Sequence, residues 1–212
     1  MSVPTLTRRE KQQRTRDALL QAAARLFCKR GLDGASIDEL AQEAGYTKGA
    51  FYANFKSKEE LFLVMLDERF AEELDRIDRA LAGTEEPQAE ARAAATDFIH
   101  FAGDEDWPRL YIQFVAHAAR NEDFREELAT RHRAMRARLG EILERWKQGT
   151  GHEPPVPIEQ ITAMMSFMAD GFLTDRLIQP ELSEELYPTM VGVFLRGLAA
   201  IAEEQETSAG SG

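Results

Sequence analysis

Apolar residues recur at intervals of three and four along most of the chain, a spacing that predicts an all-α protein. Leu66, Phe70, Leu74 and Ile77 form such a stripe and indicate one long helix. No run alternates apolar and polar residues as a half-buried strand does, and Val, Ile and Thr are scarce beside Ala, Leu, Glu and Arg.

Capping residues and glycines divide the first third of this pattern into three helices. The first is expected over residues 7–30, with Gly31 ending it. Ser36 begins a capping-box pattern and a short helix that Gly45 ends, and Thr47 can cap a second short helix reaching about residue 55.

Longer helices follow in the rest of the chain. Ser57 begins another capping box and a helix that reaches about residue 82. Further helices are expected over residues 88–102, 108–117, 122–148, 158–178 and 188–204. The stretch 149–157, with three prolines, is the clearest loop, and 207–212 is expected to be a disordered tail.

Two short helices joined by a glycine turn and backed by a longer helix form a helix-turn-helix, which places its second short helix in the major groove of DNA. Four residues are expected to face inward against Phe27 and Leu26: Ile37, Leu40, Phe51 and Phe55. The outward residues are then Thr47, Lys48, Gly49, Tyr52 and Asn54. The alternative is a plain helical hairpin with a polar outer face.

The charge distribution changes this picture, because the net charge of −11 by itself argues against a nucleic-acid partner. Residues 1–60 carry 11 Lys and Arg against 8 Asp and Glu, whereas residues 61–212 carry 15 against 29. A basic head on an acidic body is typical of a protein whose head has an anionic partner, although a solvated basic helix face remains the alternative.

Several other classes of protein are excluded by the sequence. No uninterrupted apolar run reaches the roughly 18 residues of a membrane span, and the basic N-terminus lacks the apolar segment of a secretory signal. The single Cys28 agrees with a cytoplasmic protein and leaves no cysteine metal cluster. The four histidines lie far apart and no catalytic motif occurs, so we expect no enzyme, metal or cofactor.

The segment from Thr47 to Leu61, TKGAFYANFKSKEEL, resembles the recognition-helix signature of the tetracycline-repressor (TetR) family. The resemblance extends back through Ser36 to the end of the first helix and covers about residues 10–65. It implies a homodimeric transcriptional regulator that binds double-stranded DNA at a palindromic operator. The implied organisation is a DNA-binding domain over residues 1–56 and a helical ligand-binding and dimerisation domain over 57–206.

Residue roles also follow from this resemblance. It implies phosphate contacts from Thr47, Tyr52 and Lys58, a phosphate at the amino end of the second helix beside Ser36, and a base or phosphate contact from Lys48. Gly49 would permit close approach to DNA. Asn54 departs from the aromatic or His residue common in the family, so its base contact is a hypothesis, and Lys56 is either a phosphate contact or solvated. Arg8, Arg9, Lys11 and Arg14 would form either an arm in the minor groove or a disordered leader.

The last two expected helices carry more large apolar residues than one buried stripe needs, which indicates a partner helix pair. The family resemblance places a dimeric four-helix bundle here, and the alternative is an intramolecular hairpin. The expected interface residues are Met165, Phe172, Leu173, Met190, Phe194 and Leu198.

A ligand pocket is expected among the helices of the second domain. Its candidate lining residues are Phe98, Phe101, Trp107, Tyr111, Phe114, His117, Met164 and Met168. Their Met and aromatic character favours an apolar or aromatic ligand. The sequence therefore predicts a repressor released from its operator by a small ligand; an activator, a ligand-independent repressor and a helical protein-interaction module are the alternatives.

Overall fold

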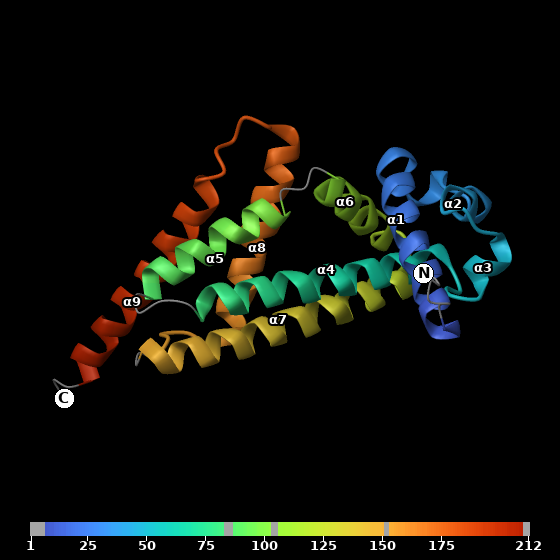
Figure 1. Ribbon diagram of the computed structural model, residues 1–212. Helices are drawn as coiled ribbons and strands as arrows, with labels where there is room; N and C mark the ends of the chain where they lie inside the picture. Colours follow the sequence, from blue (N-terminus) through green and yellow to red (C-terminus); the bar gives the residue numbers. More distant parts are fainter. Residues whose placement is uncertain (1–6, 83–86, 103–105, 151–152, 210–212) are drawn as a thin grey trace, which may run out of the picture. The chain divides into compact units, whose positions relative to one another are not determined.

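The computed structural model describes residues 7–82, 87–102, 106–150 and 153–209 (Figure 1). Within these residues the chain forms nine α-helices and no strand, which confirms the all-α prediction. The helices are α1 (Arg8–Gly34), α2 (Ile37–Glu43), α3 (Lys48–Tyr52), α4 (Lys58–Leu81), α5 (Pro87–Ala102), α6 (Asp106–Ala118), α7 (Glu122–Thr150), α8 (Ile158–Ile178) and α9 (Leu186–Ala209).

The helices group into two compact units. The first unit comprises residues 1–68 and 105–128 and contains α1, α2, α3 and α6; the second comprises residues 69–104 and 129–212 and contains α5, α8 and α9. The helices α4 and α7 contribute residues to both. The family resemblance implied a second domain over residues 57–206, which would include α6.

The expected caps form at the starts of the short helices. The Ser36 hydroxyl accepts a hydrogen bond from the Glu39 amide at 3.2 Å, and the Glu39 carboxylate accepts from the Ser36 amide at 3.1 Å. The Thr47 hydroxyl accepts from the Ala50 amide at 3.3 Å. These bonds satisfy backbone donors that the first helical turn leaves without partners, so both helices begin where the sequence predicts.

Several boundaries differ from the prediction, among them those of α1, α3 and α9. Gly31 has φ 74° and kinks α1, and the helix adds one more turn to Gly34. The regular part of α3 ends at Tyr52, although the Phe55 amide still donates to the Phe51 carbonyl oxygen at 2.9 Å. The helix α9 continues to Ala209, into the expected disordered tail, and residues 210–212 lie outside the described residues.

The first unit is built around a core of phenylalanines. Phe27, Phe51, Phe62 and Phe114 are all fully buried, and they come from α1, α3, α4 and α6. Phe62 stacks on Phe114, and Phe27 meets the Phe114 ring edge to face. Burial of each ring stabilises the unit by roughly 2–3 kcal/mol, and the contacts with Phe114 join α1 and α4 to α6.

The second unit has two apolar clusters. The first surrounds Phe98, Phe172 and Tyr187, from α5, α8 and α9. The second surrounds Leu139 of α7 and Ile161 of α8. Residues of both clusters line the cavity described below.

Candidate nucleic-acid interface and apolar cavity

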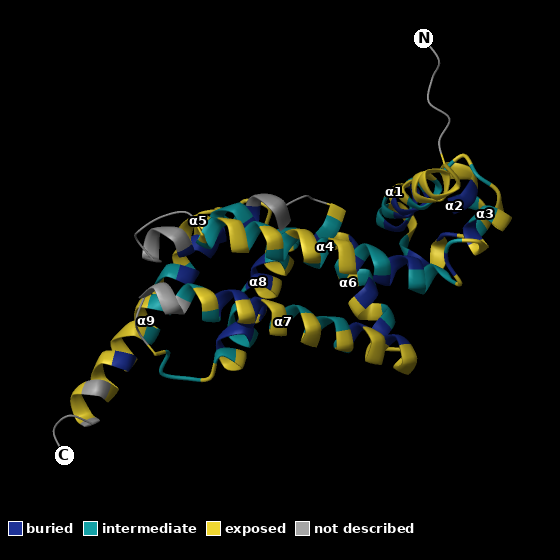
Figure 2. Cartoon of the chain, turned by 60° about the horizontal axis from the view of Figure 1, so that its bottom comes forward, coloured by how far each residue is buried: buried dark blue, intermediate teal, exposed yellow. Residues whose placement is uncertain are grey.

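The outer surface of α3 is polar and exposed (Figure 2). Thr47, Lys48, Gly49, Tyr52 and Lys56 are all exposed, and Tyr52 retains 52% of its surface. The opposite side of the helix carries Phe51 and Phe55, which are 0% and 2% exposed. The helix is thus held from behind while its polar side stays accessible, as a recognition helix requires.

The turn before α3 depends on Gly45. Its φ of 77° lies in the left-handed region, which side chains with a Cβ adopt only with strain. The following amide, from Tyr46, donates to the Ala41 carbonyl oxygen at 2.8 Å. Ala41 is 1% exposed, so α2 and α3 approach closely here and their relative orientation is fixed.

Acidic residues of α2 neutralise part of the basic surface. The Lys48 ammonium donates to the Asp38 carboxylate at 2.9 Å, and this hydrogen bond raises the Lys48 pKa. The Arg30 guanidinium donates to Glu39 at 2.5 Å. The Glu39 pKa is lowered, first by the Ser36 backbone amide and then by Arg30. Both ion pairs are exposed and therefore contribute little stability in water.

Two predicted DNA contacts have intramolecular partners. The Asn54 amide nitrogen donates to the Ala50 carbonyl oxygen at 2.8 Å. The Lys58 ammonium donates to the carbonyl oxygens of Leu32 at 2.5 Å and Ala35 at 2.8 Å. Lys58 therefore joins the start of α4 to the end of α1 with two of its three N–H donors.

The basic stretch at the start of α1 is helical. Arg8, Arg9, Lys11 and Arg14 are all exposed in the first turns, behind a capping box between Thr7 and Glu10. The disordered leader is therefore wrong for these four residues, and the arm in the minor groove stays a prediction.

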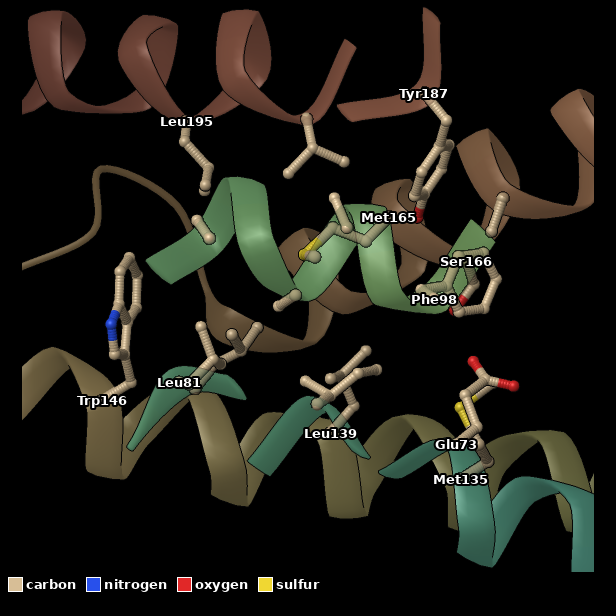
Figure 3. A pocket seen from close by; sticks show the side chains of 17 residues that line it. Glu73, Leu81, Phe98, Met135, Leu139, Trp146, Met165, Ser166, Tyr187 and Leu195 are labelled. Carbon is tan, nitrogen blue, oxygen red and sulfur yellow. The ribbon is translucent and has the colours of Figure 1, made fainter. Parts of the chain in front are cut away.

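A mostly apolar cavity of about 60 Å³ lies within the second unit (Figure 3). It is bounded by α4, α5, α7, α8 and α9. Its lining residues are Glu73, Ile77, Leu81, Ala91, Ala94, Ala95, Phe98, Met135, Leu139, Leu143, Trp146, Met165, Ser166, Ala169, Tyr187, Val191 and Leu195.

One end of the cavity is polar. Figure 3 shows Glu73, Ser166 and Tyr187 at this end and Trp146 and Leu81 at the other. Burial raises the pKa of Glu73 to about 7. Burial also raises the pKa of Tyr187, with the Glu73 carboxylate adding to the effect, so Tyr187 keeps its proton.

Only some of the residues expected to line the ligand pocket line this cavity. Phe98 is a lining residue, and Met168 packs against the cluster around Phe98. Met164 is partly buried and is not among the lining residues. The side chain of Phe101 lies outside the described residues.

Four other expected lining residues belong to α6 and to the first unit. Phe114 is a core residue, and the His117 ring meets Phe124 edge to face at 5.0 Å. Trp107 and Tyr111 stack on each other, with ring centroids 6.4 Å apart. None of these four lines the cavity.

Sequence reasoning missed Glu73, the only carboxylate among the lining residues. Its position contained a signal, because Glu73 falls three residues after Phe70 and four before Ile77, on the apolar stripe of α4. A charged residue at an apolar position is costly to bury, so it calls for a specific explanation.

The helices α8 and α9 expose large apolar residues. Phe167 is 66% exposed, Ile178 72% and Val193 57%, and Leu186 and Ile201 are also exposed. Figure 2 shows exposed positions along α9. Residues Leu186–Gln205 are long and apolar enough, by length and composition, to cross a membrane. Polar residues interrupt this segment, so it contains no continuous apolar run of that length.

The expected interface residues are placed differently from these exposed ones. Met165, Phe194 and Leu198 pack against the cluster around Leu139, and Phe172 and Leu173 belong to or pack against the cluster around Phe98. Met190 is partly buried.

Two family models match the chain. Residues 19–65 match the bacterial regulatory proteins of the tetR family, and residues 87–200 match the C-terminal domain of BetI-type transcriptional repressors. The first match covers the helix-turn-helix, and the second covers more than half of the chain.

Curated relatives and solved structures agree with these matches. The chain is 27% identical over 176 residues to the HTH-type transcriptional regulator AcrR of Shigella flexneri, covering 80% of each protein. It is 24% identical over 179 residues to the transcriptional regulator YfiR of Bacillus subtilis, covering 82% of this chain and 85% of YfiR.

Solved structures share the fold. A TetR-family regulator from Mesorhizobium loti has a TM-score of 0.74 at 19% identity, over 92% of this chain and 98% of that one. FadR from Bacillus subtilis, solved with stearoyl-CoA, has a TM-score of 0.67 at 16% identity, over 84% of this chain and 96% of that one.

These relatives are transcription regulators and not enzymes, and their shared head is the helix-turn-helix whose exposed α3 surface is described above. The chain belongs to the TetR family of DNA-binding transcriptional regulators.

Proposed function

We propose that the protein is a cytoplasmic homodimeric repressor that leaves a palindromic operator when a small ligand binds its apolar cavity. The observation that carries this proposal is the exposed polar side of α3, held in place by the buried Phe51 and Phe55. Hydroxyl, amine and backbone groups of this kind reach phosphates and base edges in the major groove.

The proposed DNA contacts are those of α3 and its flanks. Thr47, Tyr52 and Lys56 are exposed and lie at or beside α3, where they can reach phosphates. Lys48 can exchange Asp38 for DNA, because their ion pair is exposed and gains little in water. Gly49 adds no side chain, so the α3 backbone can approach the duplex closely.

Ser36, Asn54 and Lys58 contribute to the same surface. The Ser36 capping box fixes the amino end of α2, where backbone N–H groups favour an anion. Asn54 would need to release the Ala50 carbonyl before reading a base edge. Lys58 would contact a phosphate with the donor that its two carbonyl partners leave.

A second copy of the chain is the proposed partner of the exposed apolar face on α8 and α9. Phe167, Gly171 and Ile178 recur along one side of α8, and a Cβ built at Gly171 meets nothing within 4 Å. An open apolar face beside a glycine accepts another helix at close range. A palindromic operator also requires two heads related by two-fold symmetry. The apolar character of Leu186–Gln205 then reflects this interface and not a membrane.

The helix α4 is the proposed route from ligand to DNA. It carries Leu61 and Leu66 in the core of the first unit and Ile77 and Leu81 at the cavity wall. A ligand that needs a wider cavity would shift α4 and with it the spacing of the two heads. The ligand lowers operator affinity only by as much as it prefers the non-binding arrangement.

Selection of bound DNA from a random pool tests the DNA half of the proposal. We expect a palindrome whose half-sites lie one helical turn apart, about 34–36 Å, or a multiple of it. Recovery of no preferred duplex at low salt would contradict the proposal and favour a protein-interaction module.

Val193→Glu tests the dimer. The substitution places a charge on the exposed apolar face, and we expect light scattering to show a monomer with unchanged helical content. Val115→Glu is the matched control, because Val115 is 45% exposed on α6, in the other unit. A Val193→Glu protein that remains dimeric would place the interface elsewhere.

A further inference from the structure

Glu73 brings a carboxylate without a partner to the cavity wall. It makes no hydrogen bond or ion pair with any residue that the structure describes. Ser166 at the same end does not supply a donor, because its hydroxyl already donates to the Thr162 carbonyl oxygen at 2.9 Å. Glu73 is half-buried, and a carboxylate held partly away from water is costly unless another group satisfies it.

The titratable groups around Glu73 are of both signs, and they come from α4, α7, α8 and α9. Arg69, one turn earlier on α4, lowers the Glu73 pKa, whereas Asp170 of α8 raises it. Asp170 remains surface-exposed, and partial desolvation raises its pKa to about 6. Tyr187 of α9 is neutral and presents its ring and hydroxyl.

Two further titratable groups come from α7. Arg136 lowers the pKa of Asp170, and burial together with Arg136 lowers the pKa of His132 to about 4. His132 is therefore uncharged above pH 5 and offers no cation to Glu73. The face of α5 at the cavity contributes Ala91, Ala95 and Phe98, which carry no charge.

The remainder of the wall is apolar and adaptable. Leu139, Met135, Met165 and Trp146 line it, and methionine side chains repack at small cost. A cavity of about 60 Å³ holds only a few water molecules, so any organic ligand must displace these side chains and widen the space.

We propose that this cavity binds an amphiphilic organic cation, with an ammonium or amidinium group paired to Glu73 and an apolar body lying along Leu139 toward Trp146. The inference rests on the proposed ligand-responsive function and names the class of ligand. The rings of Phe98 and Tyr187, 5.2 Å apart between centroids, lie at the same end and add cation–π attraction.

Other ligand chemistries fit this wall less well. An anion would be repelled by Glu73 and Asp170. A neutral alcohol would form one hydrogen bond with Glu73 but would not stabilise its ionised form. A cation is the one class that offsets the burial of the carboxylate.

Calorimetry with three probes of equal length tests this inference: 4-phenylbutylamine, 4-phenylbutanol and 4-phenylbutyrate. The amine ends in an ammonium group, the alcohol in an uncharged hydroxyl and the butyrate in a carboxylate. In each probe a chain of four carbons, counting the carboxyl carbon, is attached to the phenyl ring. We expect the amine to bind at least tenfold more tightly than either of the others at pH 8.

Substitution of Glu73 and the pH dependence of amine binding test whether the Glu73 carboxylate is the group that pairs with the ammonium. Glu73→Gln should remove the preference for the amine, whereas Glu72→Gln, which removes an exposed carboxylate from the same helix, should retain it. Because the cation binds ionised Glu73, whose pKa is about 7, amine affinity should rise about tenfold between pH 6 and pH 8. Ionisation of Asp170 acts in the same direction, and the amine stays charged at both pH values.

The inference is overturned if the alcohol or the butyrate binds as tightly as the amine, if none of the three binds at millimolar concentration, or if amine affinity is independent of pH. The pH dependence of amine affinity, measured on the unaltered protein, tests the inference even if the Glu73→Gln protein does not fold. Release of the selected operator is measured separately. Release of the operator by the butyrate would contradict the proposal of a cationic ligand and support the ligand-responsive repressor. Amine binding without release would support the cationic ligand and contradict the ligand-responsive repressor.

Discussion

Replacing Glu73 with Gln should stabilise the protein, and by more at high pH than at low pH. Glu73 has a pKa of about 7 in the folded chain against an ordinary value of 4.5. A raised carboxyl pKa favours the protonated form, so the native state loses stability as pH rises from 4.5 to 7 and the penalty is complete above 7. Gln has nearly the same shape and never ionises.

The size of the effect follows from the two pKa values. At pH 8 the penalty that Gln removes is about 3 kcal/mol, and at pH 5, where folded Glu73 is protonated, it is less than about 1 kcal/mol. The burial of Glu73 is partial, so these values are upper limits.

Urea unfolding at pH 5, 6, 7 and 8 measures this difference. Protein concentration must be held constant, because the stability of the proposed dimer depends on it. Glu72→Gln is the control: Glu72 is exposed beside Arg76, and its loss should change stability by no more than about 0.5 kcal/mol at any pH. A Glu73→Gln protein less stable than the parent at pH 8, or a gain that is equal at all four pH values, would refute the reasoning.

Substitutions at four positions in the first unit give further predictions. Phe51→Ala should cost about 3–5 kcal/mol and abolish DNA binding, because the ring is fully buried; thermal unfolding and gel shift measure both. Gly45→Ala should cost about 1 kcal/mol through backbone strain alone, since a Cβ there meets nothing within 4 Å; Gly45→Asn, which tolerates this φ better, should cost less. Tyr52→Ala should weaken operator binding without unfolding the dimer, and unaltered affinity would contradict the assigned orientation of α3. Lys58→Ala should lower the slope of log affinity against log salt by about one, and an unchanged slope would leave Lys58 only its bonds to the Leu32 and Ala35 carbonyls.

The head could be predicted from sequence because its determinants are local. The Ser36 and Thr47 caps each act within three residues, and Gly45 acts through its own backbone dihedral. Phe51 and Phe55 were assigned to the inner side of α3 from helical spacing alone, and both are buried.

The cavity could not be predicted in the same way, because its wall is assembled from five helices. Apolar spacing marks Phe98, Phe114 and Met168 equally as inward residues. It does not say that Phe98 lines the cavity, that Phe114 fills the core of the first unit, or that Met168 packs behind the wall. The same limit applies to α8 and α9, where Phe172 and Phe194 turned out to pack inside the unit and Phe167 and Val193 outside.

The sequence by itself determined the helices, the caps and turn of the head, and the polar surface of α3, because each depends on residues no more than a turn or two apart. Only the tertiary structure decided which apolar residues enclose the cavity and that Glu73 lies among them without a hydrogen bond or ion pair to any described residue. Burial and pKa depend on what other helices place around a side chain, and that surrounding is not encoded in the residue's neighbours along the chain.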